Sequence, residues 1–317
     1  MTTHPSPTAR LGAAACAAPV SGVAAAWGVG LGLLLAAPPA AACAVCACGD
    51  PTLNLMGAEL GFAGRVRLGL DLVHRTDTVG DPETAQVQIV EQTLTAAASW
   101  SPSAAWSLAA SLPVGHRRTT DLSLAETDLW SVGDAELRAR YAALRRRPGH
   151  GSAQMGPTFG LRAPTAPVTR GPDGAVLPMS AQLGTGAWTV VAGGWAARSW
   201  RPWSIYGSAS LLQPLPGARF PTVPGRSGRA TLAAQWQPGE VLGLRAGLEG
   251  RLDQRALYDG APEPDTGGGI TFATGDLLWS PTPDLILRVG GGLPVINALT
   301  GFHDEGPLLT AGLTVDL

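Results

Sequence analysis

Residues 236–253 of this 317-residue chain are WQPGEVLGLRAGLEGRLD, a Trp-Gln-Pro turn followed by side chains of alternating character. From residue 242 onward, apolar and charged side chains alternate with a period of two, the pattern of a β-strand with two different faces. The apolar face contains Leu242, Leu244, Ala246, Leu248 and Leu252, and the other face contains Arg245, Glu249, Arg251 and Asp253. A charged side chain facing lipid costs about 2–4 kcal/mol at the bilayer midplane. The stretch therefore predicts a strand between lipid and a hydrated interior.

The Trp-x-Pro turn recurs at residues 100–102, 200–202 and 279–281, and a Trp-less turn, RRRPG, occupies residues 145–149. Proline ends a strand because it has no N–H to donate to the ladder. Tryptophan is favoured at a membrane–water interface, where its ring meets lipid and its N–H meets water. We therefore expect these turns to form one rim of a barrel, with a set of interface aromatics: Trp100, Trp200, Trp203, Trp236 and Trp279.

The spacing of the turns predicts the number of strands. Successive turn prolines are 36–54 residues apart, room for two strands of about ten residues and one longer loop. The Gly-, Pro- and Asp-rich loops are expected near 74–86, 114–130, 164–185, 213–229, 254–268 and 296–307. Five short turns and six long loops predict about twelve antiparallel strands. An even number places both ends of the barrel on the short-turn, periplasmic side.

Other segments alternate in the same way. The expected outward positions are Val66, Leu68, Leu70, Leu72, Ala135, Leu137, Ala139, Tyr141, Leu309, Ala311, Leu313, Val315 and Leu317. The positions expected on the opposite face are Arg65, Arg67, Asp71, Arg75, Asp134, Glu136, Arg138, Arg140, Thr310, Thr314 and Asp316. Near 188–197 and 270–280 the sequence does not show which residues face outward and which face inward, and we expect a β-bulge in at least one of these two segments.

Composition supports a barrel over the alternatives. Hydrophobic residues make up 45% and charged residues 15% of the chain, yet no uncharged apolar run past residue 50 approaches the roughly 20 residues of a membrane helix. The strands of a soluble sandwich or propeller would also show alternating apolar and polar residues. Each propeller blade has four strands, however, whereas the turns in this sequence are spaced for two strands each. The net charge of -2 does not favour nucleic-acid binding.

The N-terminal region predicts export. Residues 1–42 have an apolar centre at 29–37 and end in Ala40-x-Ala42, the small-residue pattern of a signal-peptide cleavage site. Residues 43–57 follow as a Cys-rich segment that forms a plug or a periplasmic tail, and residues 58–317 form the barrel. Cys43, Cys46 and Cys48 have three alternative roles: a disulfide or other structural role, a soft-metal or redox site, or, for Cys43, a lipidated N-terminus.

Three motifs resemble one known family. Residues 132–141 (VGDAELRARY) resemble the GD-x-x-L-x-x-K/R-Y strand of the outer-membrane family named for a phenol-degradation (meta) pathway. Residues 183–188 (LGTGAW) resemble its LGTGS-type strand entry, and residues 112–117 (LPVGHR) resemble its strand-end Pro before an Arg-bearing loop. The resemblance implies a porin- or transporter-like barrel over residues 50–317. The Cys-rich start and the terminal Leu317 depart from the family pattern.

These observations predict an all-β protein of the bacterial outer membrane that passively admits small molecules. We expect lipid, the barrel-assembly machinery and a small solute as partners, no nucleic acid, no catalytic residues and no resident cofactor. The alternatives are a barrel with a periplasmic Cys-based metal or redox site, and a sealed structural barrel. The charged candidates for the lumen wall are Arg65, Arg67, Asp71, Glu136, Arg138, Arg140, Arg245, Glu249, Arg251 and Asp253.

Overall fold

The computed structural model describes residues 62–147, 151–171, 174–177 and 179–317. The expected signal peptide and the Cys-rich segment, expected as a plug or a periplasmic tail, lie outside these residues. The main strands are β1 (Val66–Val79), β2 (Val87–Trp100), β3 (Trp106–Asp121), β4 (Glu126–Val132), β5 (Ala135–Tyr141), β6 (Leu144–Arg146), β7 (Gly151–Ala163), β8 (Thr189–Trp200), β9 (Trp203–Pro214), β11 (Ser227–Trp236), β12 (Leu242–Asp253), β15 (Gly268–Thr282), β16 (Leu285–Leu299), β17 (His303–Glu305) and β18 (Leu308–Asp316). Within the described residues, no helix is long and apolar enough to cross a membrane.

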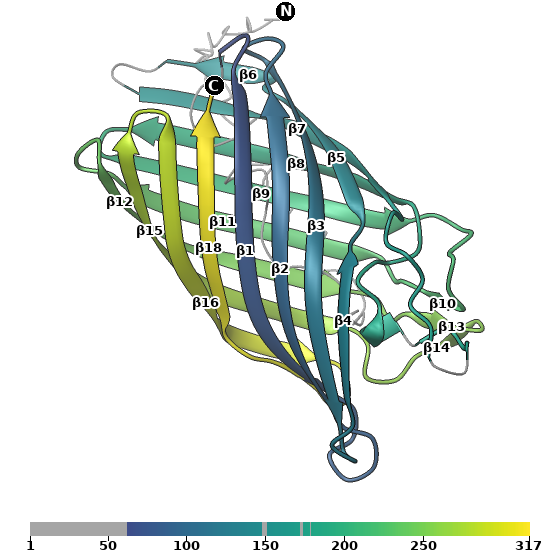
Figure 1. Cartoon of the computed structure of the whole chain (residues 1–317). Helices are drawn as coiled ribbons and strands as arrows, with labels where there is room; N and C mark the ends of the chain where they lie inside the picture. Colours follow the sequence, from purple (N-terminus) through teal and green to yellow (C-terminus); the bar gives the residue numbers. More distant parts are fainter. Residues whose placement is uncertain (1–61, 148–150, 172–173, 178) are drawn as a thin grey trace, which may run out of the picture. The chain divides into compact units, whose positions relative to one another are not determined.

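The strands form one closed antiparallel barrel (Figure 1). β1 pairs with β2 on one side and with β17 and β18 on the other, and this second pairing closes the ring. β4, β5 and β6 form one interrupted strand, because β3 pairs with β4 and β5 while β7 pairs with β5 and β6. β17 and β18 likewise form one interrupted strand. The described part of the chain therefore confirms the predicted twelve-strand barrel.

The four Trp-x-Pro turns lie where the sequence predicts them, whereas the fifth expected turn, at 145–149, begins within β6, and its residues 148 and 149 lie outside the described residues. Trp100, Trp200 and Trp236 each end a strand, and Trp279 lies near the end of β15. The backbone N–H of Leu317, just after β18, donates to the carbonyl of Val66 at the start of β1 (2.9 Å), so the first and last barrel strands meet at this rim. We call this rim the short-turn end and the opposite rim the long-loop end.

The two faces of the barrel differ as the alternation predicts. On β1, Leu68, Leu70 and Leu72 are 43–44% exposed, whereas Arg67 and Arg75 are 5% exposed. Because Cβ atoms alternate across a strand, the leucines form part of an outward apolar surface and the arginines point inward. The expected bulge also occurs, as two register shifts in the pairing of β15 with β16.

Some predicted long loops are wrong. Most of residues 114–130 form a β-hairpin, in which β3 and β4 pair from Val114↔Val132 to Thr120↔Glu126 and leave only residues 122–125 as a turn. β1 and β2 pair up to Val79↔Val87, and β16 runs to Leu299. Backbone pairing continues beyond the outward apolar surface of the barrel. The polar side chains in these extensions face water, and polar side chains in water are compatible with a β-strand.

The remaining loops carry small elements at the long-loop end. β10 (Thr222–Val223), β13 (Leu257–Tyr258) and β14 (Ala261–Pro262) form a separate three-stranded sheet. The segment between β7 and β8 contains one turn of 3-10 helix, η1 (Met179–Ala181). In Figure 1 these elements lie at the opposite end of the barrel from the terminus of β18.

Candidate functional site

The barrel encloses a cavity of about 210 Å³. Its wall comes from inward side chains of most strands and from residues 183–185, between β7 and β8. Among the described residues, seven arginines and six carboxylates line it: Arg75, Arg117, Arg138, Arg162, Arg229, Arg245, Arg288, Asp71, Glu91, Asp134, Glu136, Glu249 and Asp276. The cavity is therefore polar, with nearly balanced charge.

Two carboxylates in this wall each bridge two arginines. Glu136 accepts hydrogen bonds from Arg138 on its own strand (2.5 and 2.8 Å) and from Arg162 on β7 (2.8 and 3.0 Å). These contacts bind the charged groups of neighbouring strands to one another. A buried carboxylate is stable only when such partners replace its hydration.

Asp276 makes the corresponding bridge across β12, β15 and β16. It accepts hydrogen bonds from Arg245 (2.8 Å) and Arg288 (2.9 Å), and Arg288 also donates to Asp71 on β1 (2.6 Å). Arginine suits these positions because its planar guanidinium can donate to two acceptors at once. The lumen wall is thus a chain of shared ion pairs.

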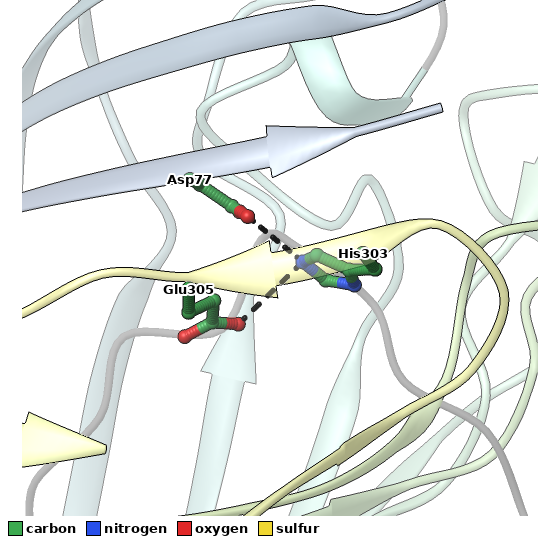
Figure 2. A group of neighbouring side chains, drawn as sticks. All are labelled: Asp77, His303 and Glu305. Carbon is green, nitrogen blue, oxygen red and sulfur yellow. Dashed lines mark ion pairs between the residues drawn. The ribbon is translucent and has the colours of Figure 1, made fainter. Parts of the chain in front are cut away.

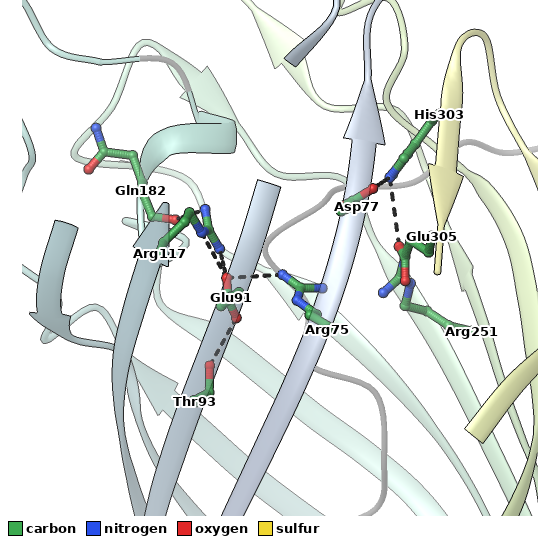
Figure 3. A network of polar contacts seen from close by, with 9 residues as sticks. All are labelled: Arg75, Asp77, Glu91, Thr93, Arg117, Gln182, Arg251, His303 and Glu305. Atoms are coloured by element: carbon green, nitrogen blue, oxygen red, sulfur yellow. Dashed lines mark hydrogen bonds and ion pairs between the residues drawn. The ribbon is translucent and has the colours of Figure 1, made fainter. Parts of the chain in front are cut away.

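A third bridge connects the wall to the segment between β7 and β8 (Figure 3). Glu91 on β2 accepts hydrogen bonds from Arg75 (3.2 Å) and from the Nε of Arg117 (2.7 Å). The Nη1 of Arg117 donates to the carbonyl oxygen of Gln182 (2.7 Å). Gln182 is fully buried against this lumen-wall arginine, so the segment lies inside the barrel at this residue.

We call residues 164–188 the inner loop. Asp134 anchors both ends of it: its Oδ2 accepts hydrogen bonds from the backbone N–H (2.6 Å) and hydroxyl (2.8 Å) of Thr185, and its Oδ1 accepts one from the N–H of Ala166 (3.3 Å). The hydroxyl of Thr165 donates to the carbonyl of Gly133 (2.8 Å). The register of β3 shifts by one residue between β4 and β5, so Asp134 lies in a bulge that directs its side chain to the loop.

The three motifs of the family resemblance converge at this anchor. Asp134 belongs to the first motif and Thr185 to the second. The N–H of Gly133 donates to the carbonyl of Pro113, in the third motif (2.8 Å). A Cβ on Gly115, also in the third motif, would come within 2.7 Å of Leu183. The motifs thus share one structural task, fixing the inner loop to the lumen wall.

The short-turn end of the lumen is narrower. A cavity of only about 20 Å³ remains there, lined in part by Arg65, Arg67 and Arg140. The guanidinium of Arg140 lies 4.1 Å from the ring centre of Trp195, and Tyr206 is 2% exposed in the same apolar cluster. Side chains narrow this end of the barrel, while the larger charged cavity extends toward the long-loop end.

The ten charged candidates from the sequence fall into three groups. Asp71, Glu136, Arg138, Arg245 and Glu249 line the large cavity, and Arg65, Arg67 and Arg140 line the small one. Arg251 and Asp253 are buried and make an ion pair of 2.8 Å near the long-loop end. The interface aromatics Trp100, Trp200, Trp203, Trp236 and Trp279 are 37–50% exposed at the short-turn end. Cys43, Cys46 and Cys48 lie outside the described residues.

Sequence reasoning did not select several residues of the wall. Glu91, Arg117, Arg162, Asp276 and Arg288 all line the cavity. The sequence signal for these residues is weaker: on β2, Glu91, Thr93 and Thr95 share one face and line the cavity, but Gln92 interrupts the apolar residues on the other face. The inward path of the inner loop was also missed, because it depends on Asp134, Arg117 and other residues far from it in sequence.

The comparisons with known proteins concern the fold. No protein-family model matches the chain, and a search of curated proteins finds no match. The solved structure of an outer-membrane channel from Pseudomonas putida F1 is 16% identical, with a TM-score of 0.63 and coverage of 85% of this chain and 100% of that chain. The translocator domain of the autotransporter NalP from Neisseria meningitidis is 12% identical, with a TM-score of 0.47 and coverage of 82% and 91%. The first likeness shows that the chain has an outer-membrane barrel fold, whereas the resemblance to the phenol-pathway family stays a prediction.

Proposed function

We propose that this chain is an outer-membrane channel of narrow bore for the passive movement of small polar solutes, with both chain ends in the periplasm. The observation that carries the proposal is the charge-lined cavity inside a closed barrel. A sealed structural barrel has no need of a polar cavity in its centre, because unfilled space and buried charge are both costly. A hydrated passage needs such a wall, since water and solutes must find hydrogen-bonding partners along it.

The outer surface supports the membrane location. The outward positions of the strands carry leucine, valine and alanine, and tryptophans mark the short-turn end. An apolar belt with an aromatic rim suits a lipid bilayer and its interface. The tight turns match the periplasmic side of such barrels and the longer loops match the outer side. On this orientation the inner loop enters the lumen from outside the cell.

The arrangement of the lumen favours small solutes. The inner loop contacts the lumen wall through Gln182, and Arg140, Trp195 and Tyr206 narrow the short-turn end. Seven arginines and six carboxylates among the described lining residues predict a weak preference between anions and cations. We therefore expect a low conductance, passage of small polar molecules and exclusion of large ones.

Planar-bilayer recording on detergent-refolded protein tests this proposal. We expect steady single-channel steps under a KCl gradient, with a small reversal potential. Arg245→Gln removes a cation from the cavity wall and is expected to shift the reversal potential toward cation preference. Arg226→Gln is the matched control, because Arg226 is exposed between β10 and β11. A folded barrel that gives no steady current would contradict the proposal and support the sealed alternative.

A further inference from the structure

Three potential metal ligands meet where the barrel closes (Figure 2). Asp77 lies on β1, and His303 and Glu305 lie on β17, with Asp77 paired to Glu305 and Val79 paired to His303. Residues 303 and 305 are two positions apart and therefore point to the same face of their strand. All three side chains are at most 2% exposed. The first and last strands of the barrel thus contribute to one buried cluster.

The ligand atoms are close enough to share one ion. His303 Nε2 is 2.9 Å from Asp77 Oδ1 and 3.7 Å from Glu305 Oε1. One potential ligand atom from each of the three residues lies within 4.8 Å of the other two. Zinc bonds to imidazole nitrogen and carboxylate oxygen at about 2.0–2.2 Å, which places tetrahedral ligands about 3.3–3.6 Å apart. The two observed separations bracket this range, so small side-chain movements suffice.

Several of these atoms lack a hydrogen bond. Neither carboxylate oxygen of Asp77 and neither ring nitrogen of His303 has a hydrogen-bond partner among the described residues. The short approach of His303 to Asp77 is therefore a contact without hydrogen-bond alignment. Burying a carboxylate without hydrogen-bond partners is costly, and a metal ion bonded to Asp77 would offset part of that cost.

The neighbouring arginines are engaged elsewhere (Figure 3). Arg251 bonds to Glu305 and pairs with Asp253 (2.8 Å), and Arg75 donates to Glu91 (3.2 Å). Arg75 attracts Asp77 electrostatically, but no hydrogen bond joins them in the described structure. The contact from Arg251 orients Glu305, as outer-shell partners of metal-binding carboxylates do.

We propose that Asp77, His303 and Glu305 bind one divalent transition-metal ion, for which Zn²⁺ is the probe. One imidazole and two carboxylates match the ligand preferences of zinc, and a water molecule would complete a tetrahedral site. The ion would connect β1 to β17 at the long-loop end. It would therefore stabilise the closure of the barrel, since a ligand that binds only the folded state raises its stability.

Zinc binding to the refolded, metal-stripped barrel tests this proposal. The protein carries Cys43→Ser, Cys46→Ser and Cys48→Ser, so that the cysteines do not contribute. We expect one zinc per chain by mass spectrometry and calorimetry. We also expect the heat-modifiable folded band to survive to a higher temperature with zinc than with EDTA.

Two variants and one control locate the site. His303→Ala and Asp77→Asn are each expected to weaken zinc binding by at least about tenfold, the loss that even outer-shell changes cause, and to abolish the thermal shift. His116→Ala is the matched control, because His116 Nε2 also lies 3.0 Å from an aspartate, Asp128, but that aspartate is 48% exposed. Absence of zinc binding, or equal affinity in the folded Asp77→Asn barrel, would overturn the proposal.

Discussion

The two ends of this barrel differ in how far apart in the sequence their determining residues lie. At the short-turn end, a turn as short as Arg201–Pro202 joins neighbouring strands, and tryptophan and proline mark the boundary locally. At the long-loop end, strands continue past the apolar belt, and the inner loop is held by Asp134, which lies 51 residues before its partner Thr185. Local signals therefore determine one end, and contacts distant in sequence determine the other.

This difference bears on function. The short-turn end fixes the strand number, the register and the placement in the bilayer. At the long-loop end, Asp134 holds Ala166 and Arg117 holds Gln182, so these contacts position the inner loop. Changes at the first end are expected to affect stability and insertion, and changes at the second to affect permeation.

The largest expected effect comes from a charge on the apolar belt. Leu70 on β1 is 44% exposed and faces outward, and Leu70→Arg is expected to destabilise the barrel by about 2–4 kcal/mol in lipid. Leu122 in the β3–β4 turn is similarly exposed, at 47%, but lies beyond the belt. Leu122→Arg is therefore expected to have little effect. Urea unfolding in liposomes measures both, and equal losses would contradict the proposed position of the bilayer.

A smaller effect is expected at the anchor of the inner loop. A Cβ on Gly184 would overlap the side chains of Asp134 and Ala166, so Gly184→Ala is expected to cost about 1–3 kcal/mol. It is also expected to make the inner loop more sensitive to proteases. Gly275→Ala on β15 is the control, because nothing lies within 4 Å of its added Cβ. If both variants resist proteolysis like the parent protein, the inner loop does not depend on this anchor.

Particular residues show what the sequence could predict. The alternation of Leu68 and Leu70 with Arg67 is a period of two, so the fold and the faces of β1 follow from local pattern. The position of Asp134 on the inward face was also predictable. The role of Asp134 as an anchor was not predictable. That role depends on a one-residue bulge and on a hydrogen bond from Thr185, at the far end of the inner loop.

The cluster at the barrel closure illustrates the same limit. Asp77 and His303 are more than 200 residues apart and meet only because the last strand pairs with the first. The long loop expected near 296–307 contains His303, but no local pattern there indicates that it meets Asp77. Pairing over such separations follows from the closure of the barrel and not from any local motif.

The most direct test of the central claim is the single-channel conductance of a barrel with a shortened inner loop. Residues 168–181 are replaced by a short Gly-Ser linker, which leaves Ala166, Thr185 and the barrel strands intact. The control shortens the exposed β3–β4 turn at residues 122–125. If the inner loop narrows a hydrated lumen, the first variant conducts more current than the parent protein and the control conducts the same. An unchanged conductance in a folded variant without residues 168–181 would contradict this account.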